Sequence, residues 1–387
     1  MATIKKILSP KKDEPVEQNR SSSDTLKSLM KDKDYSVDIY NSIVPAGTAI
    51  SSGSIILDSV VNIRSGQVIR LVGKGAEQGK TSLSFVLAEN YMKTMPNSKT
   101  IFVKAEGRLS KEMKERVGLT FVDSPDDWKN GTVFVLSCNV FETVAKIIVD
   151  TLKSGYECGE HICIIIDSLD GLILKKDLEK HMDGEAKVAG VPKLTKELFR
   201  HLALPIAHYD ALLMITGQYA AEIKIDPYAP NIPRQASSSG GSSIGHQSDY
   251  VFEFQPRYNG DFILEKPKEQ PDQFKNKIKG LWVKLAIRKS ANDVSGVTVK
   301  YPIKKGLTGN CVWKSLEVCD MMIAYEMVEK SGSWFKFPDD IKEKATLAGI
   351  VLQEKVQGYD NLLEYLESHE NKAILDFFTE CVLEIIS

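Results

Sequence analysis

The sequence predicts an α/β fold built on a mostly parallel central sheet, with an N-terminal helical arm and a small C-terminal α/β domain. From Tyr35 onward, short apolar runs alternate with longer stretches of helical period, which is typical of parallel sheets crossed by helices. One of these runs, Ile162–Ile166, is continuously apolar, as expected of a central strand buried on both faces. The first 21 residues are polar and charged and indicate a flexible arm.

The expected elements follow from this alternation. Strands are expected at Gln67–Val72, Thr100–Lys104, Val133–Ser137, Ile162–Asp167, Leu212–Thr216, Tyr250–Gln255, Leu281–Ile287 and Gly296–Pro302. Helices are expected at about 79–94, 140–154 and 193–207 and over Ala373–Ile386. Residues 178–191 and 219–247 carry no helical or strand pattern. Loops of such length inside a compact domain are usually functional or disordered.

Three parts are expected along the chain: an arm with a short helix over residues 1–37, a core over 38–312, and a C-terminal domain with an acidic tail over 313–387. In the arm, Ser22 or Ser23 is expected to cap a helix that ends near Lys33. This helix carries three apolar side chains at helical spacing, those of Leu26, Leu29 and Met30.

Composition and charge narrow the functional classes. Of the 387 residues, 42% are hydrophobic and 26% are charged, which is ordinary for a globular protein. The six cysteines include no Cys-x-x-Cys pair, which favours reduced thiols over a zinc site. The net charge of −2 excludes a generally basic nucleic-acid binder. The charge is nevertheless unevenly distributed. Residues 261–305 carry eleven Lys/Arg against five Asp/Glu, whereas residues 339–387 carry four Lys against eleven Asp/Glu. The basic segment is either a second duplex-contacting surface or a solvated face.

A glycine-rich loop stands between an expected strand and an expected helix. The residues that we expect at the nucleotide are Gly73, Lys74, Gly75, Ala76, Glu77, Gln78, Gly79, Lys80, Thr81 and Ser82. Glycines allow backbone N–H groups to close on phosphates, and the helix N-terminus adds partial positive charge. Lys80 would neutralise the β- and γ-phosphates of ATP, and the Thr81 hydroxyl would ligate Mg²⁺. The alternative is a lysine-rich strand–helix turn without a ligand.

Polar side chains follow three of the expected strands at their carboxyl ends. Asp167 ends the apolar run at 162–166 and is placed to hold the Mg²⁺ shell, although a capping role is the alternative. Glu106 follows the strand at 100–104 and could deprotonate an attacking water, unless it is a plain surface glutamate. Gln218 could hydrogen-bond a γ-phosphate and pass that contact to the loop that begins at Tyr219.

That second loop is rich in glycine and serine and also carries cations and aromatic rings. Lys224 and Arg234 could follow a phosphate backbone, and Tyr219 or Tyr228 could stack on bases. The composition of the loop therefore favours single-stranded DNA as a ligand.

These features stand in the order of a known family. The motifs that carry the resemblance are Ala46–Asp58 with Gly66, the glycine-rich loop, Ala105-Glu106, Asp167-Ser168, Gln218 and Val328–Phe335. Residues 38–336 resemble the bacterial RecA recombinases, and especially their phage UvsX-type relatives. The resemblance implies a RecA-type P-loop ATPase core with Glu106 as general base, Asp167 in the Mg²⁺ shell and Gln218 as γ-phosphate sensor. It places two DNA-binding loops at 180–190 and 219–245, with the residues Lys180, Lys187, Lys224, Arg234, Ser237, Ser238, Ser239, Gly240 and Gly241.

The chain departs from the family pattern at several positions. Lys74 replaces the usual first glycine of the loop, and Met113 stands at the adenine-stacking aromatic position. Arg288 fits the first of two basic residues that reach a neighbour's γ-phosphate, and Lys289 follows it, but Ser290 stands where the second is expected. His246 replaces an aromatic residue that relays the sensor loop to the next subunit.

The resemblance implies a DNA-dependent ATPase that binds ATP and Mg²⁺, forms head-to-tail helical filaments on single-stranded DNA and exchanges strands with duplex DNA. The helix at Leu26–Met30 would dock on the next subunit. Loader or mediator proteins and single-strand-binding proteins are possible partners, and no membrane contact is expected. We expect a cytoplasmic protein, associated with the nucleoid or, if phage-encoded, in the host cytoplasm. The alternatives are a ring-forming motor of the helicase kind and a weakly catalytic recombination mediator.

Overall fold

The structure is a computed structural model that describes residues 21–32, 47–74, 78–107, 109–178, 190–221, 236–238, 242–266, 269–272, 274–306 and 311–386. The chain divides into two compact units, Met1–Val44 and Pro45–Ser387.

The first unit contains helix α1, Ser22–Lys31. Its cap is Ser21, not Ser22 or Ser23 as expected, because the Ser21 hydroxyl accepts a hydrogen bond from the Asp24 backbone N–H at 3.1 Å and donates one to the Asp24 carboxylate at 2.7 Å. The helix also ends before Lys33, since Asp32 is already extended. Two apolar side chains remain in water, with Leu26 58% and Leu29 42% exposed.

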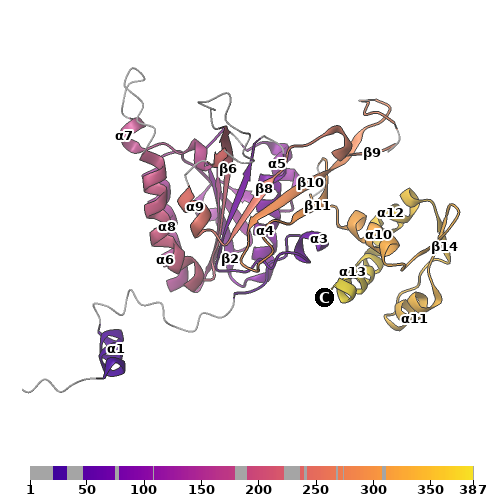
Figure 1. The fold of residues 1–387 in the computed structure, drawn as a ribbon, viewed down its shortest axis with the longest axis horizontal. Helices are drawn as coiled ribbons and strands as arrows, with labels where there is room; N and C mark the ends of the chain where they lie inside the picture. Colours follow the sequence, from indigo (N-terminus) through magenta and orange to yellow (C-terminus); the bar gives the residue numbers. More distant parts are fainter. Residues whose placement is uncertain are drawn as a thin grey trace, which may run out of the picture. The chain divides into compact units, whose positions relative to one another are not determined.

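The second unit is built on a mixed sheet of eleven described strands (Figure 1). Their bounds are β1 Gln67–Gly73, β2 Ser98–Lys104, β3 Thr120–Val122, β4 Thr132–Ser137, β5 His161–Asp167, β6 Leu212–Ala221, β7 Ala236–Ser238, β8 Tyr250–Phe254, β9 Phe262–Leu264, β10 Ile278–Lys289 and β11 Thr298–Lys304. The main path runs β11-β10-β8-β1-β6-β5-β2-β4-β3, with parallel pairing from β8 to β3 and antiparallel pairing of β10 with β8 and with β11. All eight expected strands are confirmed, and the short strands β3, β7 and β9 are additions.

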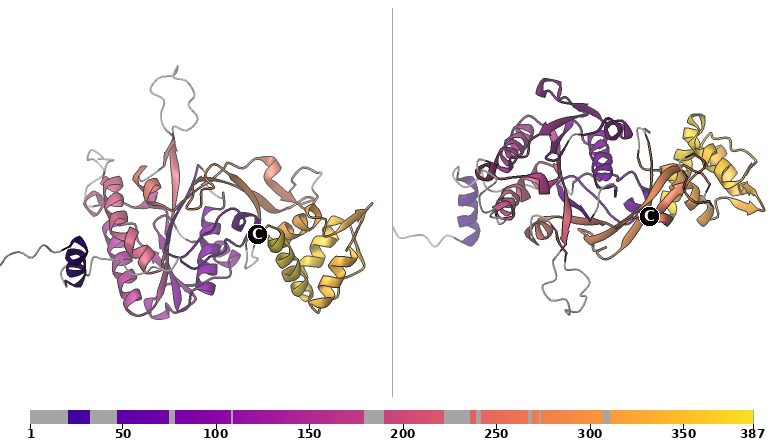
Figure 2. Two further views of the ribbon diagram at one scale, coloured as in Figure 1. Left: turned by 60° about the horizontal axis from the view of Figure 1, so that its bottom comes forward. Right: turned by 90° about the horizontal axis from the view of Figure 1, so that it is seen from above.

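Helices cover both faces of this sheet. Helix α4, Lys80–Thr94, packs on one face, where the ring of Phe85 lies edge-on to Phe102 at 5.0 Å between centroids. Helices α6, Phe141–Glu157, and α8, Gly190–His208, cover the other face together (Figures 1 and 2). Strand β5 contributes side chains to the hydrophobic cores on both faces of the sheet, since Ile165 packs on the α4 side and Ile164 on the α6 side. Burial on both faces explains its continuous apolar run.

The two stretches without a sequence pattern are partly regular, which corrects the expectation. Strand β6 continues to Ala221 because β7 supplies it with an antiparallel partner, and helix α9, Ser242–Gln247, follows. Helix α7, Lys175–Leu178, and the start of α8 occupy the two ends of the other stretch. Residues 179–189 and 222–235 lie outside the described residues. The remaining short helices are α3 Ile55–Asp58, α5 Lys111–Arg116, η1 Pro125–Asp127, η2 Leu169–Gly171, η3 Asn259–Asp261 and η4 His369–Asn371.

The C-terminal part has a hydrophobic core of its own. It contains α10 Lys314–Ala324, α11 Asp339–Leu347, α12 Tyr359–Glu367, α13 Lys372–Ile386 and a three-stranded antiparallel sheet of β12 Glu329–Ser331, β13 Trp334–Lys336 and β14 Lys355–Gln357. Phe335, Phe378 and Val318 lie in this core, to which α3 contributes Ile55. The boundary at 312/313 stays a prediction. No helix in the described ranges has the length and apolar character to cross a membrane.

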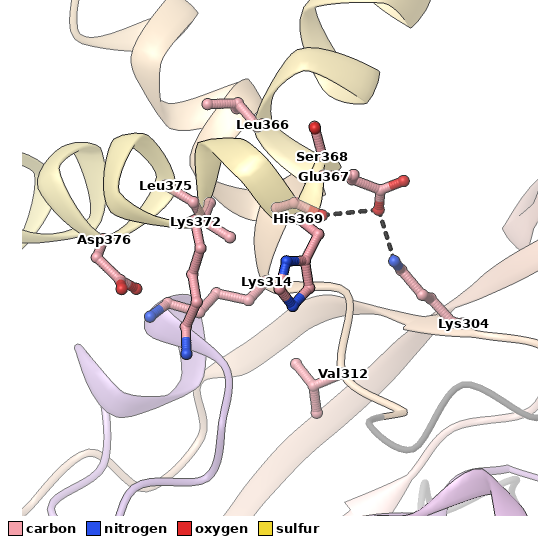
Figure 3. A pocket seen from close by; sticks show the side chains of 11 residues that line it. Lys304, Val312, Lys314, Leu366, Glu367, Ser368, His369, Lys372, Leu375 and Asp376 are labelled. Carbon is pink, nitrogen blue, oxygen red and sulfur yellow. Dashed lines mark hydrogen bonds and ion pairs between the residues drawn. The ribbon is translucent and has the colours of Figure 1, made fainter. Parts of the chain in front are cut away.

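A polar junction joins β11 to the C-terminal helices. The Lys304 ammonium lies 2.6 Å from the Glu367 carboxylate (Figure 3). This carboxylate also accepts hydrogen bonds from the Ser315 hydroxyl and from the Trp313 indole. A cavity of about 370 Å³ opens beside this pair. Nearby, the buried Glu317 carboxylate accepts hydrogen bonds from the Ser54 hydroxyl at 2.5 Å and the Ile55 N–H at 2.8 Å.

Candidate nucleotide site

The glycine-rich loop joins β1 to α4; one of its glycines has a backbone conformation that favours glycine, and another lies close to its neighbours. Gly79 has φ +103°, a conformation that favours glycine, immediately before α4 begins. A Cβ atom on Gly73 would lie 2.3 Å from the Gln78 side-chain oxygen and 3.1 Å from the Phe254 carbonyl oxygen. The chain can therefore turn tightly toward the helix N-terminus. Lys74 is exposed, and Gly75, Ala76 and Glu77 lie outside the described residues.

The loop borders a cavity of about 680 Å³ at the carboxyl ends of the parallel strands. The cavity brings together residues that lie far apart in the sequence and that the sequence analysis placed at the site: Gln78, Gly79, Lys80, Thr81, Ser82, Glu106, Met113, Asp167 and Gln218. Burial lowers the pKa of the Lys80 ammonium, while the carboxylates of Asp167 and Asp170 oppose that shift. A bound polyphosphate would favour the charged form in the same way.

Asp167 is the hub of the polar contacts in this cavity. One of its carboxylate oxygens accepts a hydrogen bond from the Thr81 hydroxyl at 3.2 Å, and the other accepts one from the Thr216 hydroxyl at 2.8 Å. The Lys104 ammonium lies 3.5 Å from the first oxygen. Hydroxyl and carboxylate oxygens are the ligands that Mg²⁺ prefers, so Thr81 and Asp167 fit a magnesium shell. The sequence analysis missed Lys104 and Thr216, although both stand at strand ends next to predicted site residues.

Glu106 lies beside Asp167 on the neighbouring strand end. The Ser168 hydroxyl donates a hydrogen bond to the Glu106 carboxylate, and the Ala105 N–H donates one to the Asp167 carbonyl oxygen at 3.0 Å. A Cβ atom on Gly171 would lie 2.5 Å from the Glu106 Cγ, so a glycine is needed there to make room for the glutamate. Sequence analysis could not find Gly171, because only the packing of η2 against Glu106 reveals it.

Gln218 is positioned by its backbone. It pairs with Gly73 in the parallel register of β6 and β1, and its N–H donates a hydrogen bond to the Asp170 carboxylate at 2.8 Å. Its exposed side chain lines the cavity close to the phosphate loop. The strand then continues to Ala221, toward the segment that was expected to bind DNA.

The far wall of the cavity is largely apolar. Helix α5 begins at the Ser110 cap, whose hydroxyl accepts a hydrogen bond from the Met113 N–H at 3.1 Å, and Met113 faces the cavity. The other apolar lining residues, which sequence analysis missed, are Phe262, Ile278, Leu281 and Ile303. Arg257 and Lys305 add positive charge to the lining. This wall has the chemistry expected for a flat nucleobase.

The chain is similar over most of its length to curated proteins named Protein RecA. It is 25% identical to that of Rickettsia prowazekii (strain Madrid E) over 329 residues, which cover 83% of this chain and 81% of the relative. It is 23% identical to that of Mycoplasma mycoides over 344 residues, which cover 87% and 83% of the two chains. No protein-family model matches the chain. At these identities the chain resembles RecA proteins over most of its length. The finer, UvsX-type resemblance stays a prediction.

Arg288 and Lys289, which are expected near a neighbour's nucleotide in a RecA-like assembly, do not line this chain's own cavity. The Arg288 guanidinium forms an ion pair with Glu253 of β8. The Lys289 ammonium donates hydrogen bonds to the backbone carbonyls of His246 and Ser248 at 2.7 and 2.5 Å. Contact with a second subunit therefore stays a prediction for both cations.

The residues expected to bind DNA are only partly described. Ser237 and Ser238 lie in β7, where they pair with Ala220 and Tyr219 of β6. The others lie outside the described residues: Lys180, Lys187, Lys224, Arg234, Ser239, Gly240 and Gly241. Strand β7 nevertheless ties the end of the second loop to the strand that carries Gln218.

Proposed function

We propose that this chain hydrolyses ATP in response to single-stranded DNA, assembles head-to-tail on that DNA as a helical filament, and pairs it with homologous duplex. The observation that carries the proposal is the convergence of Lys80, Thr81, Glu106 and Asp167 on one cavity at the phosphate loop. Similarity to RecA proteins over 83% of the chain supports the same activity.

The catalytic steps follow from the contacts around Asp167 and Glu106. Lys80 and the N-terminus of α4 bind the β- and γ-phosphates, and Thr81 with Asp167 would hold Mg²⁺. The ion, when bound, neutralises charge on the phosphate oxygens. Glu106 accepts the proton of the attacking water, and Ser168 orients its carboxylate through their hydrogen bond. The apolar wall around Met113 receives the base.

In this proposal, strand β6 couples the nucleotide site to the binding of DNA. Gln218 contacts the γ-phosphate in this proposal, and the same strand leads into the segment after Ala221. Because β7 pairs with the end of β6, a shift of Gln218 changes both ends of the proposed DNA-binding loop. Filament assembly would use α1, whose Leu26 and Leu29 are exposed and are suited to a neighbouring subunit.

The test is electron microscopy with single-stranded DNA and a slowly hydrolysed ATP analogue, together with steady-state ATPase with and without DNA. We expect DNA-stimulated turnover and helical filaments. Lys80→Ala, which removes the phosphate-binding cation, should abolish both, and removal of residues 1–34 should abolish filaments while ATP binding persists. Closed rings without DNA, accompanied by unwinding, would instead indicate a helicase-like motor.

The mediator alternative has one structural observation in its favour. Arg288 is held by Glu253 within its own chain, and Ser290 hydrogen-bonds Asn292, so the expected pair of cations reaching toward a neighbour is incomplete. A parent protein that binds ATP but shows no DNA-stimulated turnover would support the mediator. Stimulated turnover that is lost in Arg288→Ala at unchanged ATP affinity would support the filament.

A further inference from the structure

The loop that joins β9 to β10 carries an aromatic ring in open water. The Phe274 side chain is 82% exposed, more than any other aromatic side chain in the described part of the chain. Strand β9 and the start of β10 project from the edge of the sheet (Figures 1 and 2). A phenyl ring at such a position gives up the free energy of burial, and its apolar face stays accessible to a ligand.

A buried asparagine forms several hydrogen bonds within the loop around Phe274. The Asn276 side chain is 1% exposed; its oxygen accepts a hydrogen bond from the Lys266 N–H at 2.8 Å. Its amide N–H groups lie 3.0 to 3.2 Å from the backbone carbonyls of Lys266, Glu269 and Gln270. One asparagine thus ties Lys266 to Glu269 and Gln270 on the opposite side of the loop.

A second turn fixes Phe274 itself. One Asp272 carboxylate oxygen accepts hydrogen bonds from the N–H groups of Phe274 at 2.9 Å and Lys275 at 2.7 Å. These two donors lower the pKa of the Asp272 carboxyl. The backbones of Asp272 and Asn276 also exchange hydrogen bonds in both directions. The carboxylate is therefore engaged by the loop, and the lysines beside it remain available to a ligand.

The surroundings of the ring are basic. Lys275, Lys277 and Lys279 are exposed, and none of them forms an ion pair with another described residue. The nearby Lys266 is paired with Glu269 at 3.5 Å. Lysine is depleted from the cores of protein–protein interfaces, which argues against a protein partner centred on this ring. A ring between free lysines suits a ligand with flat bases and a phosphate backbone.

We propose that the Phe274 ring stacks on an unpaired base of single-stranded DNA while Lys275 and Lys277 contact the adjacent phosphates. In a duplex the base faces are covered by their neighbours, so the ring selects the single strand. The inference rests on the proposed function and adds a DNA contact outside the two loops expected at 180–190 and 219–245. The root of the same ribbon lines the nucleotide cavity through Phe262, Ile278 and Leu281, so the two ligands would share one structural element.

The experiment measures binding of a fluorescein-labelled oligo(dT) by the full chain at several salt concentrations, with a slowly hydrolysed ATP analogue present. Loss of one stacked base, about 1–3 kcal/mol by alanine substitution, predicts that Phe274→Ala weakens binding about 5- to 150-fold with an unchanged salt slope. The double variant Lys275→Gln/Lys277→Gln should lower the slope of log K against log salt by about 0.7 for each lost phosphate contact. Leu347→Ala, which removes a 90% exposed apolar side chain of α11, is the control and should bind as the parent does.

A tryptophan at the same position reports the contact directly. The emission of Phe274→Trp, relative to the parent, should be quenched when oligo(dT) binds. Unchanged affinity of Phe274→Ala, or emission that responds to protein concentration without DNA, would overturn the proposal; the second result would place the ring against another subunit. A parent that binds no single-stranded DNA would overturn the proposed function as well, which separates the two failures.

Discussion

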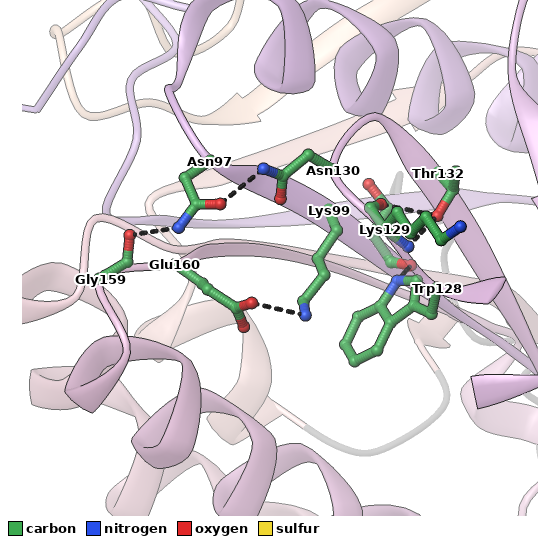
Figure 4. A network of polar contacts seen from close by, with 9 residues as sticks. Asn97, Lys99, Trp128, Lys129, Asn130, Thr132, Gly159 and Glu160 are labelled. Atoms are coloured by element: carbon green, nitrogen blue, oxygen red, sulfur yellow. Dashed lines mark hydrogen bonds and ion pairs between the residues drawn. The ribbon is translucent and has the colours of Figure 1, made fainter. Parts of the chain in front are cut away.

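A lysine–carboxylate pair lies at each end of the neighbouring strands β2 and β5, and the two pairs differ in their surroundings. At the amino ends, the Lys99 ammonium lies 2.9 Å from the Glu160 carboxylate and 4.3 Å from the centre of the Trp128 ring (Figure 4). At the carboxyl ends, the Lys104 ammonium lies 3.5 Å from Asp167. The parallel register places both pairs across the same two strands, since Ser98 pairs with His161 and Lys104 with Asp167.

The difference lies in what surrounds each pair. At the amino ends, the pair lies beside a chain of protein hydrogen bonds: Asn130 donates to the Asn97 side chain at 2.6 Å, and Asn97 donates to the Gly159 carbonyl oxygen at 2.9 Å (Figure 4). At the carboxyl ends, the pair opens into a cavity of about 680 Å³. The same strand pair therefore borders a cavity at one end, called the open end below, and a network of protein hydrogen bonds at the other, called the closed end.

The largest effect is expected from the proposed base at the open end. Glu106→Gln keeps the size of the side chain and its contact with Ser168 and removes only proton acceptance. Turnover should fall by about 10²–10⁴, the usual contribution of general-base catalysis, with nearly unchanged ATP affinity. Steady-state ATPase and the off-rate from single-stranded DNA test this, and the off-rate should fall because ATP persists between subunits. DNA-stimulated turnover that survives the substitution would move the base to another residue.

The lysines of the open and closed pairs should also differ in their effect on the Mg²⁺ concentration that nucleotide binding requires. In Lys104→Gln, Asp167 loses a competing cation, and the Mg²⁺ concentration for half-maximal binding of a fluorescent ATP analogue should fall about fivefold, the equivalent of about 1 kcal/mol. Lys99→Gln is the matched control and should leave that concentration unchanged. A higher Mg²⁺ requirement in Lys104→Gln would show that the lysine binds the phosphates instead.

The carboxylate of Glu317 is buried and has no ion-pair partner among the described residues. Its ionisation should therefore make the stability of the protein depend on pH. Burial raises the pKa of Glu317 to about 7, with the nearby Asp58 adding to the shift and hydrogen bonds from Ser54 and Ile55 opposing it. The folded state then binds the proton more tightly than the unfolded state. The stabilisation is full below about pH 4.5 and is lost as the pH rises through 7, up to about 3 kcal/mol.

Glu317→Gln should remove this part of the pH dependence, because the amide cannot ionise. Urea unfolding of the two proteins between pH 5 and pH 8 measures it, and the stability of the variant should fall less steeply across that range. Ser54→Ala removes one hydrogen-bond donor to the carboxylate but keeps the carboxyl, so as the control it should show a pH dependence at least as steep as that of the parent. Equal slopes in the parent and Glu317→Gln would contradict the assignment.

At the closed end, the expected effect is on stability alone. Lys99→Gln breaks a partly buried ion pair and a cation–π contact, so the free energy of unfolding should fall by about 1–2 kcal/mol. ATPase activity should stay at the parental value. Urea unfolding and turnover measured on the same preparation test this, and a loss of turnover larger than the loss of folded protein would refute the structural role.

The main strands and helices of the core were predictable because their apolar runs are long and strongly periodic. Strand β5 was identified by a run of five apolar residues, and α4 by the loop that precedes it. The short elements were not predictable, since strands of three residues such as β3 and β7 depend on a partner strand for their hydrogen bonds. The same reason explains why β6 extends to Ala221. The cap of α1 was misplaced by one residue because consecutive serines offer equivalent local signals.

The sequence by itself determined the chemistry of the candidate site: a glycine-rich loop before a helix, and carboxylates at the ends of apolar strands. These signals are local, and the topology of parallel strands brings them to one edge. Only the tertiary structure decided which partners they meet. Lys104 contacts Asp167 across two strands, and Gly171 in an η-helix makes room for Glu106 at a neighbouring strand end. Asn276 hydrogen-bonds across the loop that exposes Phe274. Such contacts depend on register and packing, which no local pattern encodes.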